Sequence, residues 1–126
     1  MSSFMNTPDA TSSYSQSDIK QNKVMAVLAY LGFLVLVPIL AAKESPYARF
    51  HASQGLNLFV SEVAFGIINV ILTLIFSFIP LLNVVWLIIA WLIGIAFFVL
   101  MILGIVNAVQ GKAKQLPIVG GFRILK

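Results

Sequence analysis

The sequence predicts an all-α fold: a polytopic membrane helical bundle with three transmembrane helices and a short interfacial C-terminal segment. Of its 126 residues, 60% are hydrophobic and 10% are charged, whereas soluble domains are about half apolar and about a quarter charged. The apolar residues concentrate in three runs, residues 24–42, 56–80 and 84–109. Apolar runs of about 18 residues or more span bilayers as helices, because lipid offers the backbone no hydrogen-bond partners.

The composition also excludes several classes of function. The chain has no cysteine, which excludes disulfides, thiolate metal sites and a cysteine nucleophile. Its net charge of +4 comes from basic residues beside the apolar runs, so membrane topology and lipid headgroups explain it more simply than nucleic acid does. No glycine-rich phosphate loop, close acid pair or metal-binding spacing of an enzyme is present. We therefore expect a non-enzymatic protein without a cofactor.

The N-terminal 17 residues are polar and include six serines, which predicts a disordered tail ahead of one membrane domain at residues 18–126. Asp18 and Gln21 fit a capping box, so the first helix is expected to begin near Ile19. A cleaved signal peptide is the alternative interpretation. It is disfavoured because the first apolar run is longer than a usual signal core.

Prolines and glycines predict where the helices begin and end. Pro38 is expected to kink or end the first span, because proline removes a helical hydrogen bond. Ser45 is a candidate N-cap with Pro46 in the first helical position of the second helix. A tight turn is expected at Pro80, which would join the second and third helices as an antiparallel hairpin. Gly111 is placed to cap the third helix at its C-terminus.

Basic residues assign the sides of the membrane. With three spans, Lys20 and Lys23 fall on one side and six basic residues on the other: Lys43, Arg49, Lys112, Lys114, Arg123 and Lys126. The excess of basic residues on the second side predicts a cytoplasmic C-terminus and an external N-terminus in a bacterial cytoplasmic membrane. The apolar tail at residues 116–126 is too short to span and should lie at the interface or fold back on the bundle. A re-entrant tail or first run would change this count.

A polar stripe is expected along one face of the second span. At 100° per residue, its polar and small side chains fall within an arc of about 140°. The polar members are His51, Gln54, Ser61, Glu62, Asn69 and Thr73. Asn57 lies outside the arc and is the clearest exception. Two interpretations remain open: the stripe packs against another helix or subunit, or it lines a hydrophilic path or substrate groove.

Two residues of the stripe are candidates for a functional role. A carboxylate at Glu62 costs about 2.5 kcal/mol or more in the membrane, so it requires protonation, water or a partner such as the Tyr30 hydroxyl, Asn107 or a neighbour's basic group. His51 is the only histidine and has no second ligand at a metal-binding spacing. We expect it to join an interfacial hydrogen-bond cluster near Arg49 rather than to bind a metal.

Two further sets of residues are candidates for contacts. Small residues recur at four-residue spacing in the third span, which allows close helix packing; these are Ala90, Gly94, Gly104 and Ala108. An interfacial basic cluster is expected on the cytoplasmic side and consists of Lys43, Arg49, Lys112 and Lys114. The lipid bilayer is thus one partner, and a second copy or other membrane subunits are the others.

Two blocks of sequence resemble a known family. Residues 43–55 read Lys-x-Ser-Pro-Tyr-x-Arg-Phe-His-Ala-x-Gln-Gly, and residues 107–120 read Asn-Ala-x-x-Gly-Lys-x-x-x-Leu-Pro-x-x-Gly. This pattern resembles the Tic-twenty family, which includes the central membrane subunit of the chloroplast inner-envelope protein-import translocon. The resemblance covers residues 23–122. It implies a membrane helical bundle and, for plastid members, a role in a protein-conducting complex.

Three functional hypotheses follow. The first is a transport or translocation component, working as an oligomer or with partners, whose polar stripe lines the path. The second is an accessory or scaffold subunit that uses the small-residue face of the third span and the basic cluster. The third is a lipid-headgroup-binding protein that uses Arg49 and His51.

Overall fold

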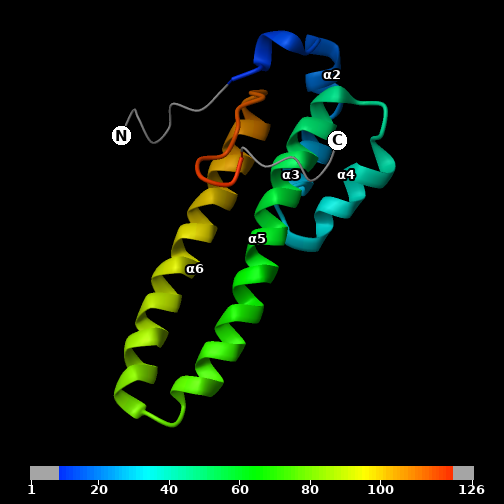
Figure 1. Cartoon of the computed structure of the whole chain (residues 1–126). Helices are drawn as coiled ribbons and strands as arrows, with labels where there is room; N and C mark the ends of the chain where they lie inside the picture. The colour runs from blue at the N-terminus through cyan, green and yellow to red at the C-terminus, as the bar shows by residue number, and fades with distance from the viewer. Residues whose placement is uncertain (1–8, 121–126) are drawn as a thin grey trace.

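The computed structural model describes residues 9–120, and those residues are helical apart from turns and one isolated β-bridge (Figure 1). In chain order the elements are η1 (Thr11–Ser13), α2 (Gln16–Gln21), α3 (Lys23–Leu28), η2 (Gly32–Val35), α4 (Leu36–Ala41), α5 (Pro46–Phe76) and α6 (Pro80–Val109). The predicted all-α class is confirmed. The predicted third transmembrane helix is not.

Two long helices, α5 and α6, pack side by side as an antiparallel hairpin (Figure 1). As predicted, α5 begins at Pro46, and the Ser45 hydroxyl accepts a hydrogen bond from the backbone N–H of Ala48 (3.0 Å). Gly111 follows the end of α6 with a φ of +75°, a conformation that glycine adopts without steric cost. The hairpin turn differs from the prediction. It lies at residues 77–79, because Pro80 occupies the first turn of α6.

Both long helices are candidate membrane spans. They contain 31 and 30 residues, with a mean hydropathy of 2.2 and 2.9 in their most apolar windows. At 1.5 Å per residue each is about 45 Å long, enough to cross a hydrocarbon core of about 30 Å. Very little of either window is buried. The core helix of a soluble protein would bury one face, so the exposure of both helices favours a lipid environment.

The first apolar run does not form a span, which corrects the sequence prediction. The chain reverses direction after α3, where Gly32 has a φ of +63°, and α4 returns beside α5 (Figure 1). We call residues 23–42 the V-segment. Pro38 lies within the first turn of α4, where its missing N–H costs no helical hydrogen bond. The break is therefore set by the turn at Gly32 and not by the proline.

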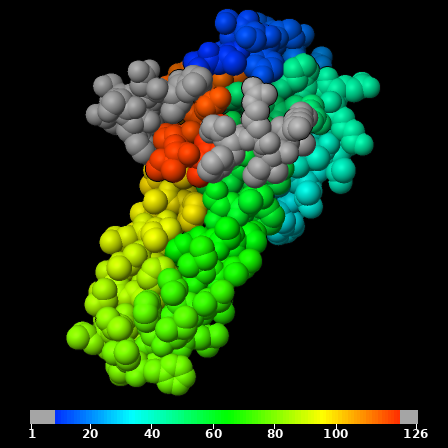
Figure 2. Space-filling view, in the orientation of Figure 1, coloured from blue at the N-terminus to red at the C-terminus, as the bar shows by residue number. Residues whose placement is uncertain are grey.

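Burial divides the described chain into two regions. We call residues 9–58 and 100–120 the head, and residues 59–99 the free hairpin. Every buried residue that the structure describes belongs to the head, including Tyr30, Tyr47 and Leu58. Figure 2 shows a broad upper mass and a narrower α5–α6 projection below it. The free hairpin therefore contributes no buried residue to the core.

The two ends of the described chain meet in the head. The Ala10 N–H donates to the Ala113 carbonyl (2.8 Å), and the Ala113 N–H donates to the Thr11 hydroxyl (3.0 Å). Ala10 and Thr11 thus contact the segment that follows α6. The disordered tail at residues 1–17 stays a prediction, and residues 1–8 of it lie outside the described part. Helix α2 is capped by Ser15 rather than by Asp18.

Candidate functional site

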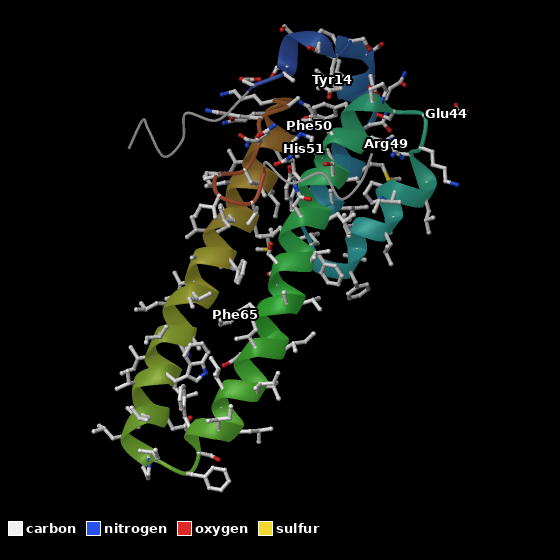
Figure 3. All side chains as sticks on the ribbon, viewed as in Figure 1. Tyr14, Glu44, Arg49, Phe50, His51 and Phe65 are labelled. Carbon is white, nitrogen blue, oxygen red and sulfur yellow. The ribbon has the colours of Figure 1, made fainter. Side chains whose placement is uncertain are left out.

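A buried histidine occupies the centre of the head. His51 is fully buried, and its Nε2 lies 2.9 Å from the Lys112 carbonyl oxygen. Its Nδ1 lies 2.5 Å from the Tyr30 hydroxyl. The rings of Tyr30, Tyr47 and Phe50 meet the imidazole edge to face. Figure 3 labels Phe50 and His51 in the head. The single histidine thus joins three separate parts of the chain.

The partners of His51 define the tautomer of its neutral imidazole. A carbonyl oxygen only accepts hydrogen bonds, so Nε2 must carry the proton that bonds Lys112. Burial raises the pKa of Tyr30 well above its usual range, with a smaller contribution from Tyr47, so the Tyr30 hydroxyl keeps its proton. That hydroxyl donates to Nδ1 of a neutral imidazole. The group acts as a structural connector, and the predicted interfacial polar cluster is instead a buried one.

The Asp18 carboxylate links the chain just before the V-segment to the chain just after it. It accepts hydrogen bonds from the Ser45 hydroxyl (2.5 Å), the Tyr47 backbone N–H (3.0 Å) and the Asn22 side chain (2.9 Å). Three hydrogen bonds to one carboxylate hold these segments together more firmly than bonds between neutral groups would. Sequence reasoning assigned Asp18 only a local capping role. Its partner Ser45 is 27 residues away, and no local pattern reveals that pairing.

Two amides of α5 hold the C-terminal segment against the head. Gln54 accepts from the Leu116 N–H (2.8 Å) and donates to the Gly120 carbonyl (3.0 Å). Asn57 donates to the Val119 carbonyl (3.0 Å). Residues 112–120 therefore fold back on the helices, as one of the two sequence alternatives proposed. Asn57 was the exception to the predicted stripe, and the structure makes it part of the same contact.

Close packing of backbone and ring depends on two glycines. A Cβ at Gly55 would overlap the carbonyl oxygen of Ala29, and a Cβ at Gly104 would overlap the Tyr30 ring. Gly104 and Ala108 of the predicted packing set are buried in the head. The other two members behave differently: Ala90 is half-buried and Gly94 is exposed with open space around it.

The structure separates the members of the predicted polar stripe. His51 and Gln54 are buried in the head, whereas the remaining four lie on the free hairpin. There Ser61 donates to the Asn57 carbonyl (2.8 Å), and the Asn69 amide oxygen accepts from the Trp86 indole (2.9 Å) and the Thr73 hydroxyl (3.3 Å). These bonds stay within α5 and α6. The stripe is thus two sets of contacts rather than one continuous face.

Glu62 bonds neither of the two partners expected from its own chain, Tyr30 and Asn107. The Tyr30 hydroxyl is bonded to His51, and the Asn107 amide faces the Lys114 carbonyl (3.5 Å). Glu62 is half-buried on α5, just beyond the head. Within residues 9–120 no hydrogen bond or ion pair of its carboxylate is found, and a carboxylate at membrane depth requires protonation, water or a partner group.

Charged side chains gather in the head. Among the described residues, every Lys, Arg, Asp and Glu except Glu62 belongs to the head. The predicted basic set lies there on separate elements: Lys43 precedes α5, Arg49 is within it, and Lys112 and Lys114 follow α6. In the same described part, no three His, Asp or Glu side chains lie close enough together to hold a metal ion.

The free hairpin carries a shallow apolar groove of about 460 Å³. It is lined by Asn69, Leu87, Ala90, Trp91, Gly94, Ile95 and Phe98. The Phe65 ring faces α6 within the hairpin (Figure 3) and contacts Trp86 and Phe97. The groove is thus an outer surface, separate from the inner aromatic contacts.

Comparison with known proteins gives a family match. Residues 21–125 match the magnetosome magnetite crystal formation protein family, MamF/MmsF. Magnetosome protein MamF of Paramagnetospirillum magneticum is 32% identical over 93% of this chain and 87% of its own length. Magnetosome protein MmsF of the same organism is 31% identical over 76% and 79%, respectively. A UPF0132 membrane protein of Methanocaldococcus jannaschii is 34% identical over 75% and 61%. No solved structure matches the chain significantly.

These matches correct the predicted family. The resemblance to the Tic-twenty family is wrong, because the family match and the similar proteins are magnetosome and UPF0132 membrane proteins. Protein import therefore loses its support. The two blocks that carried the resemblance nevertheless meet in space, since His51 and Gln54 of the first bond Lys112, Leu116 and Gly120 of the second.

Proposed function

Because the chain belongs to the magnetosome magnetite crystal formation protein family, we propose that it is a non-enzymatic structural protein of the membrane in which such crystals form. In this proposal the free hairpin anchors the protein in the bilayer. The head stays at one membrane face as a preformed surface. The transport hypothesis is set aside, because neither the family nor the similar proteins are named for it.

One observation carries the proposal. The described chain divides into a head, whose segments are joined by hydrogen bonds and buried side chains, and a hairpin without buried residues. Apolar side chains cover the hairpin, with Phe78, Leu81 and Trp91 each at least 74% exposed. Such a surface requires lipid, because water would leave a large apolar area solvated. In the head, the polar groups of His51 and Gln54 bond other chain segments, which supports a structural rather than a catalytic role.

The charges support an orientation. In this proposal, two crossings place both ends of the described chain at the same membrane face, whereas the three-span prediction placed them on opposite faces. All six described basic residues then share that face: Lys20, Lys23, Lys43, Arg49, Lys112 and Lys114. The hairpin turn at residues 77–79 carries no charge and crosses the bilayer at low cost. A cytoplasmic head with both ends inside follows from the positive-inside rule.

Labelling of single cysteines tests this orientation, because the natural chain has none. Ser77→Cys in the turn should react with a membrane-impermeant maleimide from the outside of intact cells. Lys20→Cys in the head should react only after the membrane is opened. The reverse pattern contradicts the orientation, and reaction of both residues from one side contradicts the anchor itself.

Genetic replacement tests the role in crystal formation. The chain is expressed in Paramagnetospirillum magneticum lacking MmsF, and crystal size is measured by electron microscopy. Partial recovery of crystal size is expected from the unmodified chain and from Gly66→Ala, since open space surrounds Gly66. Gly55→Leu should insert but fail, because its side chain would overlap Ala29. Correct membrane insertion without any recovery by the unmodified chain would contradict the proposed role.

A further inference from the structure

The head and the free hairpin have different cross-sections. Four helices run side by side at the head end, namely α3, α4, α5 and α6 (Figure 1). Only α5 and α6 continue into the free hairpin. Helix α3 contacts both long helices, and α4 contacts α5. The narrowing visible in Figure 2 is therefore a property of the packing.

The V-segment is too short to cross a bilayer. From Lys23 to Leu31 the chain advances about 13 Å at 1.5 Å per residue, less than half of a hydrocarbon core of about 30 Å. It then turns at Gly32. The hydrogen bond between Asp18 and Ser45 holds the chain just before the V-segment against the chain just after it. The V-segment thus enters and leaves on the head side.

The outer face of the V-segment is apolar. Val24, Phe33 and Leu40 are 70%, 69% and 67% exposed. Its inner face is buried against α5 and α6 through small and aromatic side chains such as Ala29 and Tyr30. An exposed apolar face that continues the surface of a membrane hairpin has the lipid bilayer as its natural partner.

Charge at both ends of the V-segment favours lipid over a second protein copy. Lys23 begins the segment and Lys43 follows it, both on the head side. Lysine ammonium groups reach anionic headgroups while their methylene stems lie along apolar surface. A basic residue at each end and an apolar outer face between them match the layered chemistry of one leaflet.

We propose that the chain is a one-sided membrane wedge that favours bilayers curved with the head on the convex side. The V-segment adds two helices of about 10 Å diameter to the head-side leaflet, or about 160 Å² of area that the opposite leaflet does not contain. Unequal area in the two leaflets is relieved by bending toward the leaflet with less protein. The inference rests on the proposed anchoring of the hairpin and adds an activity to it: sorting to, or stabilising, curved membrane.

Tubes pulled from giant vesicles measure this activity together with its sign. The protein is labelled at Lys20→Cys and reconstituted in vesicles that contain anionic lipid. Molecules with the head outside should be enriched in the tube by about twofold or more over the flat membrane, as for curvature-sensitive interfacial helices. Molecules with the head inside should be depleted. Equal density for both orientations overturns the wedge.

A matched pair of double variants isolates the V-segment. Phe33→Ser with Leu40→Ser removes exposed apolar side chains from it. Leu74→Ser with Leu92→Ser removes side chains of comparable exposure, 64% and 61%, from the free hairpin. The first pair should reduce tube enrichment to near unity while insertion persists. The second should retain the enrichment. Loss in both pairs, or in neither, contradicts the assignment to the V-segment.

The depth of the V-segment gives an independent test. A fluorophore on Phe33→Cys should be quenched by spin-labelled lipid of the head-side leaflet and protected from aqueous reagents on both sides. Quenching confined to aqueous reagents on the head side overturns the wedge, and so does a Phe33→Cys disulfide between two copies. Each result leaves the hairpin anchor intact provided that Ser77→Cys still labels from the opposite side. Loss of that labelling instead identifies failure of the proposed function.

Discussion

The head and the free hairpin use the same two helices in opposite ways. In the head, α5 and α6 bury His51, Gln54 and Gly104 against segments from both ends of the described chain. In the free hairpin, residues of the same helices are exposed, with Leu74 at 64% and Leu92 at 61%. The two regions differ in charge as well, because every described charged residue except Glu62 lies in the head.

What differs is how specific the contacts are. Long-range side-chain hydrogen bonds in the head join residues 21 to 102 positions apart, as between His51 and Lys112 or Gln54 and Gly120. In the hairpin, the long-range side-chain bond is the one from Trp86 to Asn69, 17 positions away. Substitutions that test packing and hydrogen bonding should therefore have large effects in the head and small effects in the hairpin.

The largest effect is expected from His51→Ala. It leaves the Tyr30 hydroxyl and the Lys112 carbonyl without partners and opens a cavity, so the head should lose about 4 kcal/mol of unfolding free energy. Hydrogen exchange of residues 112–120 in mild detergent measures this loss. Tyr30→Phe removes only the hydroxyl and should cost about 1–2 kcal/mol. An unchanged exchange rate in both variants would show that the imidazole bonds are not structural.

The next largest effect is expected from Gly55→Ala, with a loss of about 3 kcal/mol of unfolding free energy. The new methyl group would overlap the Ala29 backbone, which cannot move aside as a side chain can. Gly66→Ala is its counterpart on the same helix. Open space surrounds Gly66, so alanine should stabilise the helix there by about 0.5–1 kcal/mol. Thermal unfolding of both variants in detergent provides the comparison. Equal shifts in Tm would remove the distinction between head and hairpin.

Gln54→Leu should cost about 2 kcal/mol, since it removes two hydrogen bonds to buried backbone groups while keeping a similar side-chain volume. Its consequence is local: the C-terminal segment should detach while the helices stay packed. Trypsin cleavage after Lys112 and Lys114 should accelerate. Ser61→Ala serves as the control, and faster cleavage in that variant as well would point to general loosening.

Asn69→Leu should have the smallest effect, about 0.6 kcal/mol, the average for a polar pair inside a membrane bundle. It removes the acceptor of the Trp86 indole hydrogen bond. The Trp86 emission should shift, with little change in insertion or in the exchange of head amides. A loss comparable to that of His51→Ala would mean that the hairpin contains a specific site after all.

Local signals in the sequence predicted the long helices well. Ser45, Pro46 and Gly111 mark the ends of helices through their own backbone chemistry, and each acts as expected. The prediction of a span in the first apolar run was wrong, because local signals do not reveal long-range contacts. The hydropathy of this run suits a span, but the reversal at Gly32 is held by the bonds of Asp18 to Ser45 and Tyr47, which are 27 and 29 residues away.

The site was predicted only in part. Helical periodicity placed His51 and Gln54 together, and both face the head interior. It missed Asn57, because a single polar face was assumed, whereas α5 is covered on more than one side within the head. Glu62 and Asn69 share the predicted angle yet lie on the free hairpin. Position along the helix axis, which periodicity ignores, decides their environment.

The span between bonded partners has a consequence for the order of assembly. The head closes only when residues before α5 and after α6 meet, as Thr11 and Ala113 do across 102 positions. The entire hairpin lies between them and must be synthesised and inserted first. Closure of the head therefore marks a completed insertion. A nascent chain that stops short of Lys112 would display an unfinished surface, with the His51 and Gln54 side chains accessible to proteases and chaperones.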